Sequence, residues 1–439
     1  MTASVRRPGS ALSALVLGLV GPLLLAAASA TSAGPASGEL DPSYGVGGVA
    51  RLALDGDRTG WQALTLAGRK VVVAGTTVTP NQTLDSVVAR YGPAGRLDRT
   101  FGRRGTVRVH VARSMTELLD IVRMPDGRLV AVGSVTSKGS GASAMLVMRF
   151  RPDGRVDRAF GTHGVVRIRF GDRLGYASGV VALPHGKVAV AGYARDHSGE
   201  TSAMVVLRLT RSGSLDPTFH GTGRLVLNTP GQTAESLLAL AKAPDGRLVA
   251  VGNGDGVVVL RLTSDGEPDP GFATDGVALL DLGEEEMATD VTVLPDDSIV
   301  VAGHHNDVSG KWVGMLARVT PAGELDTGFA GGDGYLDIPV PRSDTTLLDV
   351  TKGASGQLVL VGESVPRGPQ GTWQSLVVRT DAAGAPDASF GADGVAVTTL
   401  GARFSALREA RVARDGRILA AGFAGNRHHT SGAVARFVG

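Results

Sequence analysis

Arginines and aspartates recur along this chain at a spacing that could bring a guanidinium group against a carboxylate. Six arginines are each followed by a glycine after five residues and by an aspartate after eight. The six pairs are Arg90 and Asp98, Arg149 and Asp157, Arg208 and Asp216, Arg261 and Asp269, Arg318 and Asp326, and Arg379 and Asp387. An arginine fork matches a carboxylate in bidentate fashion, so a ring of such pairs could serve acid–base catalysis or ligand binding.

Repetition favours a structural role for these pairs, because a catalytic group is normally needed only once. The glycine permits a tight reversal that folds the aspartate back beside its arginine, where opposite charges attract. We therefore expect a latch in every unit. In an alternative interpretation, each aspartate caps a turn through an Asx hydrogen bond and never touches the arginine.

The two ends of the chain each carry one unpaired member of this pattern. Arg436 is followed by only three residues, and Asp41 has no arginine upstream at the usual spacing. If the units close into a ring, Asp41 should lie beside Arg436 and complete the last latch without a covalent connection.

Two further signatures recur with the latch and define a repeat. An aromatic residue follows each aspartate after three residues, and a glycine closes a short apolar run in each unit, as in "RLVAVG" ending at Gly133. Equivalent positions lie 51 to 61 residues apart, which is typical of propellers, solenoids or repeat arrays. The second unit contains four strand-like segments, at 106–111, 118–124, 128–133 and 144–150. We predict an all-β fold, a seven-bladed β-propeller with four antiparallel strands per blade, closed by pairing of the N- and C-terminal segments.

The first 30 residues have the pattern of a removable signal peptide. Arg6 and Arg7 precede a long apolar run, which ends in the A-x-A sequence Ala28–Ala30. We predict a signal peptide at 1–30, a flexible linker at 31–38 and the propeller at 39–439. After cleavage near Ala30, Lys and Arg fall from 44 to 42 and balance the 42 Asp and Glu, so the exported chain is close to neutral. A transmembrane anchor is the alternative interpretation of this segment.

The remaining composition excludes several classes of function. The chain has no cysteine, hence no disulfide framework or thiolate site. We see no basic stripe and no basic patch with interleaved aromatics, so we expect no nucleic-acid binding. We also see no further stretch long and apolar enough to span a membrane. Phosphate-loop, zinc-protease and nucleophile-elbow motifs are missing. We expect no metal and no cofactor.

The combination "LDxxFGxxG" with "PDG[KR][LIV]xVxG" resembles the delta-60 repeat family, a domain of unknown function with propeller-like repeats. The copies "LDPSYGVGG" at 40–48, "VDRAFGTHG" at 156–164 and "LDPTFHGTG" at 215–223 carry the resemblance, while Pro268, Pro386, Ala273 and Ala330 depart from it. The resemblance implies an exported bacterial repeat protein that is secreted or held at the cell surface. It supplies no catalytic residues.

Loops that vary between units are the candidate binding sites, because rigid elements position loops that bind. Trp312 and Trp373 each lie six residues before a latch arginine, in such loops on adjacent blades. Two exposed tryptophans side by side could stack on a sugar ring or anchor a protein. In the alternative interpretation, each one covers the end of its own blade.

The sequence thus favours a monomeric, exported, non-catalytic module that binds or scaffolds an extracellular protein or glycan. The alternative is a secreted propeller enzyme, a hydrolase or lyase with its site in the central channel. Active sites in propellers break the repeat symmetry with an odd polar cluster, and we expect none here because the units differ mainly in their loops.

Overall fold

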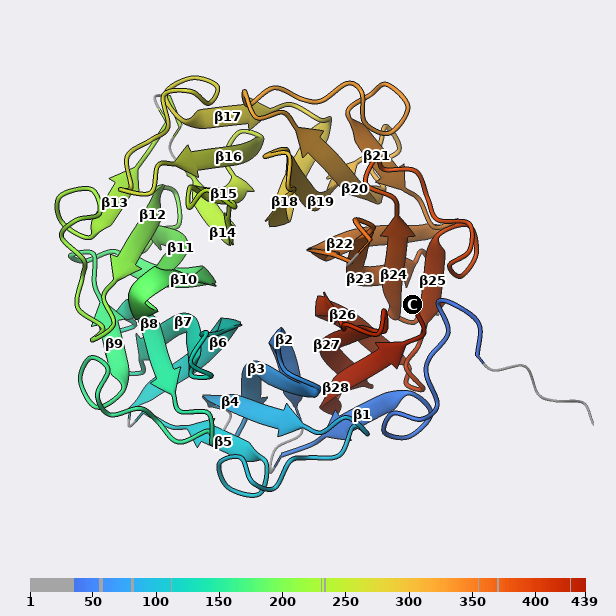
Figure 1. The fold of residues 1–439 in the computed structure, drawn as a ribbon, viewed down its shortest axis with the longest axis horizontal. Helices are drawn as coiled ribbons and strands as arrows, with labels where there is room; N and C mark the ends of the chain where they lie inside the picture. Colours follow the sequence, from blue (N-terminus) through green and yellow to red (C-terminus); the bar gives the residue numbers. More distant parts are fainter. Residues whose placement is uncertain are drawn as a thin grey trace, which may run out of the picture. The chain divides into compact units, whose positions relative to one another are not determined.

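The computed structural model of the protein describes residues 35–54, 58–79, 83–111, 113–229, 231–232, 234–353, 355–368, 371–426 and 428–439. The predicted signal peptide and the first part of the predicted linker, residues 31–34, lie outside the described residues. Pro35–Gly439 forms one compact unit. Its seven four-stranded antiparallel sheets surround a central axis (Figure 1), and this confirms the predicted seven-bladed propeller.

Blades 1 to 4 each use four consecutive strands, from the channel outward. Blade 1 contains β2 (Thr59–Ala67), β3 (Lys70–Val78), β4 (Leu84–Tyr91) and β5 (Thr106–Val109). Blade 2 contains β6 (Ser114–Arg123), β7 (Leu129–Ser137), β8 (Ser143–Phe150) and β9 (Val165–Ile168). Blade 3 contains β10 (Leu174–Ala182), the 3-10 turn η1 (Pro184–Gly186), β11 (Val188–Arg195), β12 (Ser202–Leu209) and β13 (Arg224–Leu227). Blade 4 contains β14 (Ser236–Lys242), β15 (Leu248–Asn253), β16 (Val257–Leu262) and β17 (Val277–Leu280).

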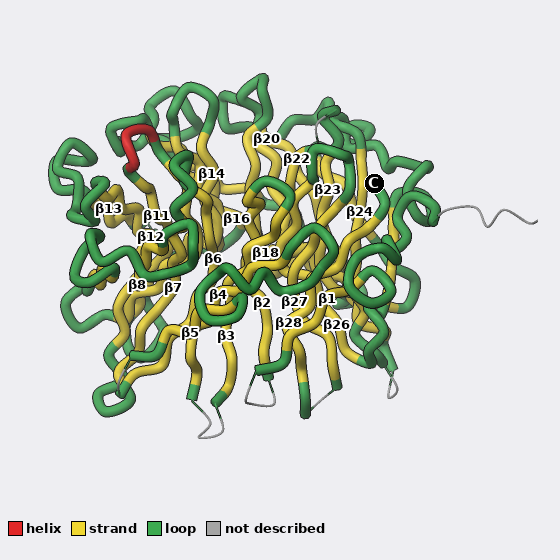
Figure 2. Tube along the Cα trace, turned by 60° about the horizontal axis from the view of Figure 1, so that its bottom comes forward, coloured by secondary structure: helices red, strands yellow, loops and turns green. Residues whose placement is uncertain are grey.

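Blades 5 and 6 repeat this order, and blade 7 differs. Blade 5 contains β18 (Glu284–Val293), β19 (Ile299–Asn306), β20 (Trp312–Val319) and β21 (Tyr335–Ile338). Blade 6 contains β22 (Ser343–Lys352), β23 (Leu358–Pro366), β24 (Gln374–Thr380) and β25 (Val395–Thr398). Blade 7 contains β26 (Phe404–Val412), β27 (Ile418–Gly425), β28 (Thr430–Phe437) and, as its outermost strand, β1 (Val49–Leu52). The first strand of the chain therefore completes the last blade. Among the described residues, η1 is the one helical element, and strands and loops make up the rest (Figure 2).

The boundaries of the blades differ from the predicted repeat unit by one strand. The segment beginning at Thr106 was expected to be the first strand of the second unit, but β5 pairs with β4 and is the outermost strand of blade 1. The latch between Arg90 and Asp98 lies in the connection between these two strands. The two continuous apolar runs are consequently the middle strands of each blade, covered by neighbouring strands within the sheet and by blades on either side.

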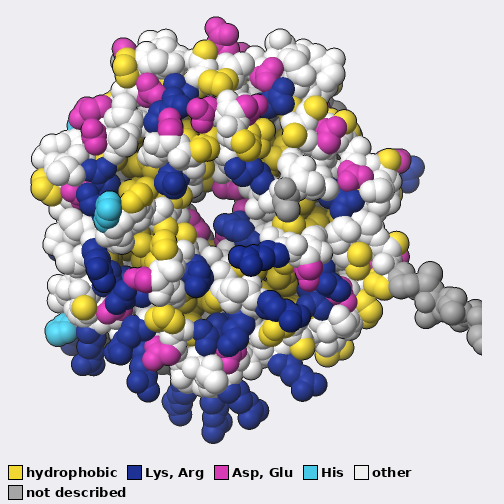
Figure 3. Space-filling view, in the orientation of Figure 1, with side chains coloured by type: hydrophobic (Ala, Val, Ile, Leu, Met, Phe, Trp, Pro, Cys, Tyr) yellow, Lys and Arg dark blue, Asp and Glu magenta, His cyan; other side chains and the backbone are white. Residues whose placement is uncertain are grey.

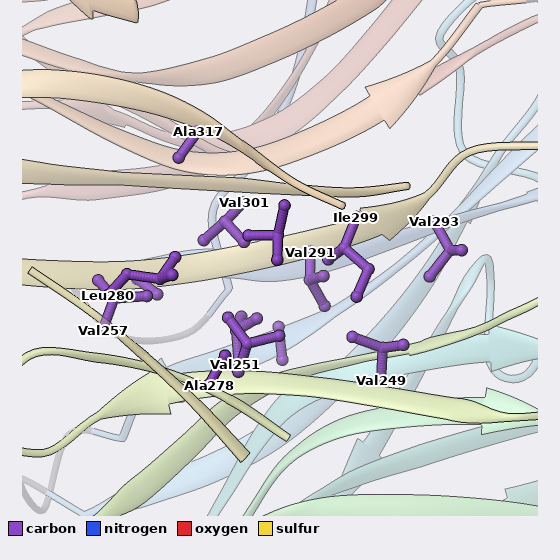
Figure 4. Packing of buried hydrophobic residues seen from close by; sticks show 14 of the residues in the cluster. Val249, Val251, Val257, Ala278, Leu280, Val291, Val293, Ile299, Val301 and Ala317 are labelled. Carbon is purple, nitrogen blue, oxygen red and sulfur yellow. The ribbon is translucent and has the colours of Figure 1, made fainter. Parts of the chain in front are cut away.

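Seven hydrophobic clusters, one at each interface between blades, hold the ring together. Figure 4 shows the cluster between blades 4 and 5, in which Val251 and Leu280 face Val301 and Val291. The other clusters join successive pairs of blades, including blade 7 with blade 1. The residues at these interfaces are mostly Val, Leu and Ala, which suit face-to-face packing of sheets about 10 Å apart.

The glycine that closes each apolar run faces a bulge in the innermost strand of its blade. In blade 2 the bulge lies between Leu118 and Asp120, and Leu118 pairs with Gly133. A Cβ on Gly133 would lie 2.0 Å from the carbonyl oxygen of Glu117. The equivalent clash in the other blades is 1.7–2.1 Å, so this position accepts only glycine. The bulge re-aims the residues that follow it toward the channel.

Candidate functional site

Each latch arginine lies against the aspartate predicted for it. The distance from arginine Nε to aspartate Oδ2 is 2.6–3.0 Å in all seven pairs, including Arg436 with Asp41. The other oxygen, Oδ1, accepts a hydrogen bond of 3.0–3.3 Å from the backbone N–H two residues later. Each aspartate therefore pairs with its arginine through Oδ2 and caps a turn through Oδ1, so the alternative in which it never touches the arginine is wrong.

The latches also connect neighbouring blades. Each arginine guanidinium lies 4.5–4.9 Å from the centroid of the aromatic ring of its own latch. Six of them donate from Nη1 to a carbonyl oxygen in the reversal of the next blade, as Arg208 does to Ser264 and Arg436 to Pro93. The glycine of that reversal approaches the ring so closely that a Cβ on Gly154 would lie 2.8 Å from Phe101. The latch is therefore placed at the seam between blades.

A second cation reaches the aspartate in five of the seven latches. It comes from the turn between the first and second strands of the blade, at the [KR] position of the "PDG[KR]" pattern. The contacts are Lys70 to Asp98, Arg128 to Asp157, Lys187 to Asp216, Arg247 to Asp269 and Arg417 to Asp41, at 2.7–3.4 Å. These contacts were not predicted from the sequence, although the lysine or arginine of this motif was a signal for them.

The charges and hydrogen bonds around the latch aspartates lower their pKa. Burial raises the pKa of Asp41, but the hydrogen bonds from Ser43 and the charges of Arg436 and Arg417 outweigh it and bring the pKa to about 2. The pKa values of Asp98 and Asp216 are lowered for the same combination of reasons, with a lysine as the second cation. These carboxylates are ionised throughout the physiological pH range.

Backbone contacts extend the closure of the ring beyond Asp41. The N–H of Asp41 donates to the carbonyl of Arg436 at 2.8 Å, and the N–H of Gly38 donates to that of Val438 at 2.9 Å. In blade 6 the N–H of Gly391 donates to Ser37 at 3.0 Å. The sequence predicted that Ser37 and Gly38 belong to a flexible linker. Instead, Ser37 is hydrogen-bonded to blade 6 and Gly38 to blade 7.

The two tryptophans are half-buried rather than exposed. The ring of Trp312 meets His304 edge-on at a centroid distance of 4.9 Å, within blade 5. Trp373 contacts Phe404 and Phe423 of blade 7 at 6.3 and 6.5 Å. The expectation of two exposed rings is wrong because aromatic neighbours cover part of each one. Their role in ligand binding stays a prediction.

A cluster of ionisable side chains lines the central channel, contrary to our expectation that the blades differ only in their loops. Four acidic residues and two arginines of the innermost strands of blades 2, 5, 6 and 7 gather here: Asp120, Asp290, Asp349, Glu409, Arg408 and Arg411. They line a cavity of about 320 Å3. Figure 3 shows acidic and basic side chains within the opening at the axis.

The channel carboxylates occupy equivalent positions, immediately after the bulge of the innermost strand. Each accepts a hydrogen bond from a backbone N–H of the next blade. These bonds run from Val180 to Asp120, from Val350 to Asp290, from Ala410 to Asp349 and from Leu64 to Glu409. Arg411 donates to Asp349 at 3.3 Å and also to Glu409. Blades 1, 3 and 4 have Ala63, Gly179 and Ala239 at the same position.

Burial raises the pKa of the channel acids. Burial is the largest cause for Asp120 and Asp349, where backbone hydrogen bonds and Arg411 oppose it. The pKa values of Asp290 and Glu409 are raised further, since the charge of Asp349 adds to the effect of burial. A carboxyl group that retains its proton near neutral pH can donate a hydrogen bond or a proton.

A sequence signal for the channel acids exists. In blades 2 to 7 the position lies thirteen residues before the closing glycine, so Asp120, Asp290, Asp349 and Glu409 align with one another. Within the described part of the chain, no three acidic or histidine side chains are placed to hold a metal ion. No helix among the described residues is long and apolar enough to cross a bilayer.

The fold places the protein among β-propellers, and comparison with sequence families agrees. A family model described as a domain of unknown function, DUF5122 beta-propeller, matches residues 69–101, 125–160, 183–219, 243–272 and 294–329. Each matched segment ends at the aromatic residue of a latch. The matches therefore follow the repeats of blades 1 to 5. Among curated protein sequences, none matches the chain.

Solved structures with similar folds include several enzymes. A streptogramin B lyase superimposes with a TM-score of 0.51 and 12% identity, covering 88% of this chain and 97% of the lyase. An ulvan lyase reaches a TM-score of 0.45 at 10% identity, with 89% and 96% covered. The alpha-L-arabinanase of Penicillium chrysogenum reaches 0.42 at 12% identity, with 87% and 93% covered. At these identities the similarity concerns the fold alone.

Proposed function

We propose that the protein is an exported, non-catalytic β-propeller that binds or scaffolds an extracellular protein or glycan. Export is supported by the basic and apolar pattern that ends at Ala30. The match to a propeller domain of unknown function supports a repeat protein of the kind that the delta-60 resemblance implies.

The proposal depends on one observation, the hydrogen bonds and ion pairs that the channel acids make within the protein. All four have an oxygen bonded to the backbone of the next blade, and Arg411 is bonded to two of them. A catalytic acid must present its reactive oxygen to a substrate within hydrogen-bonding reach. Side chains engaged in this way hold blades in register, which leaves the exterior of the ring for recognition.

The test compares binding with turnover in the same protein. The purified protein is applied to an array of defined glycans and incubated separately with chromogenic glycosides, esters and uronate-containing polysaccharides. We expect saturable binding to at least one class of glycan and no product. Binding should survive the substitutions Asp290→Asn and Glu409→Gln. Turnover that either substitution abolishes would contradict the proposal.

The alternative, an enzyme with its site in the channel, has one specific observation in its favour. Four carboxyl groups with raised pKa converge on one cavity, and perturbed titration is typical of catalytic groups. In this case Asp290→Asn should lower the turnover number by at least about a hundredfold, the usual contribution of a general acid. A retained rate would exclude Asp290 from that role.

A further inference from the structure

The outer rim of blades 1 and 2 carries an unusual concentration of exposed arginines. Between the latch arginine and the end of the outermost strand, blade 1 exposes Arg96, Arg99, Arg103, Arg104 and Arg108. The corresponding part of blade 2 exposes Arg151, Arg155, Arg158 and Arg167, and Arg169 is exposed directly after its outermost strand. These ten arginines are called the basic rim. Figure 3 shows Lys and Arg side chains gathered along this edge, over β5 and β9. The expectation that the chain has no basic stripe is wrong.

Blades 4, 5 and 6 do not share this charge. The corresponding stretches of blades 4, 5 and 6, residues 262–283, 319–341 and 380–402, contain neither Lys nor Arg. Immediately before the glycine that leads into the outermost strand, blade 1 has Arg104, whereas these blades have the exposed residues Asp275, Asp333 and Asp393. The scaffold is the same, so the latch does not require the arginines of the basic rim.

Most of the basic rim has no anionic partner among the residues that the structure describes. Arg108 pairs with Asp85 at 3.1 Å, and Arg155 lies 3.8 Å from Asp153. The other eight make no ion pair with any residue that the structure describes. Asp98 and Asp157, which lie among these arginines in the sequence, are committed to latches. Many like charges on one surface repel one another and attract an external anion.

Five of the ten arginines line two neighbouring grooves. Arg103, Arg104, Arg108 and Arg155 line a groove of about 830 Å3 between the outermost strands of blades 7 and 1. Arg108 and Arg158 line the next groove, of about 480 Å3, between blades 1 and 2. Arg108 lines both grooves, so they are neighbours on the rim, and together they are called the track.

The floors of both grooves are aliphatic. Leu52, Leu97 and Val107 lie in the first groove, and Val109 and Val165 in the second. Proteins that bind single-stranded nucleic acids stack bases on exposed aromatic rings, but Phe101 and Phe160 are buried beneath the latch arginines. Aliphatic floors flanked by guanidinium groups suit the apolar faces of sugar rings that carry anionic groups.

We propose that the basic rim binds an acidic polysaccharide, a polymer that bears carboxylate or sulfate groups along its length. Guanidinium groups match both anions in bidentate fashion, and a repeating polymer supplies one anion after another along the track. The inference rests on the proposed binding function and names the class of its ligand.

The test uses matched variants of the full protein that remove four positive charges each. The rim variant carries Arg103→Gln, Arg104→Gln, Arg155→Gln and Arg158→Gln. The control variant carries the same change at Arg69, Arg224, Arg403 and Arg414, which are exposed outside the rim. Binding to heparin, polygalacturonate, neutral dextran and a single-stranded DNA oligomer is measured by calorimetry at several NaCl concentrations. The unfolding midpoint of each variant shows whether it folds. If the rim variant does not fold, two double variants replace it. One carries Arg103→Gln with Arg104→Gln, and the other carries Arg155→Gln with Arg158→Gln.

We expect both acidic polysaccharides to bind, with an affinity that falls as NaCl rises, and dextran not to bind. The rim variant should bind at least about tenfold more weakly, since each lost contact contributes a few-fold, while the control stays within about twofold of the unsubstituted protein. Tighter binding of the DNA oligomer, equal losses in both variants or absence of polysaccharide binding would overturn the inference. Self-association of the protein that only the rim variant abolishes would also overturn the inference, because the basic rim would then contact the acidic edge of a second copy.

The outcomes separate this inference from the proposed function. A protein that binds a neutral glycan or a protein elsewhere retains the proposed function and refutes the role of the rim. Cleavage of polygalacturonate that depends on Asp290 refutes the non-catalytic function, while loss of binding in the rim variant still supports the basic rim.

Discussion

The latches and the central channel both place carboxylates between neighbouring blades, but their surroundings shift the pKa in opposite directions. At the latches, cations and turn N–H groups outweigh burial, so the aspartates stay ionised. In the channel, burial and neighbouring acids outweigh Arg411, so the pKa rises. The latch occurs in every blade, whereas the channel acids occupy four of seven equivalent positions. The comparison indicates that the latch belongs to the scaffold and that the channel tolerates variation.

The largest effect should come from removing a buried latch aspartate. Asp216→Ala leaves Arg208 buried without its carboxylate, and we expect a loss of about 3–5 kcal/mol in unfolding free energy. The aspartate side chain is 4% exposed and that of Arg208 is 9% exposed. The measurement is chemical denaturation with urea.

Asp326→Ala in blade 5 is the matched control for this substitution. Asp326 is 24% exposed and has no second cation among the described residues, so the loss should be about half as large. Equal losses at the two sites would show that burial of the pair does not determine its strength.

The closing latch should be more sensitive than an internal one. Asp41 and Asp98 are similarly buried, and each contacts an arginine of its latch and a second cation. Only Asp98 is tethered to its arginine by eight residues of chain. We expect Asp41→Ala to cost about 1 kcal/mol more than Asp98→Ala, because the untethered ends lose more order. Hydrogen exchange should accelerate at residues 38–52 only in the first variant.

Replacing an aspartate by asparagine should change the free energy of unfolding in opposite directions in the channel and in the latches. Asp290→Asn removes a charge that burial disfavours and keeps an oxygen for the N–H of Val350. At pH 8 we expect it to be neutral or to stabilise by about 1 kcal/mol. Asp216→Asn should destabilise by about 2 kcal/mol, because Arg208 and Lys187 lose their counter-charge. Destabilisation by both substitutions would contradict the comparison.

The pH dependence of stability should show both regions at once. A lowered pKa, such as that of Asp41 at about 2, gives stability that is present above the usual carboxyl pKa and is lost as pH falls through 2. The raised pKa of Asp290 and Glu409 gives stability that declines as pH rises above about 4, the usual carboxyl value. Urea midpoints should therefore pass through a maximum at mildly acidic pH. Asp290→Asn with Glu409→Gln should flatten the decline on the alkaline side.

The smallest effect should come from the second cation of an exposed turn. The side chain of Lys70 is 42% exposed where it meets Asp98. Lys70→Met should therefore cost only about 0.5 kcal/mol, and less at high salt. Thermal unfolding at low and high NaCl measures it. A loss comparable to that of Asp98→Ala would mean that the lysine, rather than Arg90, supplies most of the attraction.

The sequence predicted the ring and its latches because both depend on local spacing. The reversal is defined by a glycine five residues after an arginine and an aspartate eight residues after it. Asp41 and Arg436, which lack such a partner in the sequence, indicate how the ring closes. The residues that line the channel could not be predicted from spacing in the same way, because the bulge determines which residues of the innermost strand face the axis. The basic rim was missed because its arginines are interrupted by latch residues in sequence. Blade 2 has Asp157 between Arg155 and Arg158, and only folding separates the buried acid from the exposed bases.

The pairing of β1 with β28 also bears on the order in which the protein assembles. Blades 1 to 6 are built from contiguous stretches of chain, so each can form as its residues emerge during synthesis or translocation. Blade 7 must wait until residue 437 is available and must then capture a strand made some 380 residues earlier. A newly made chain consequently passes through a stage with an unpaired edge on β1, at which a chaperone or a second nascent chain could compete for it.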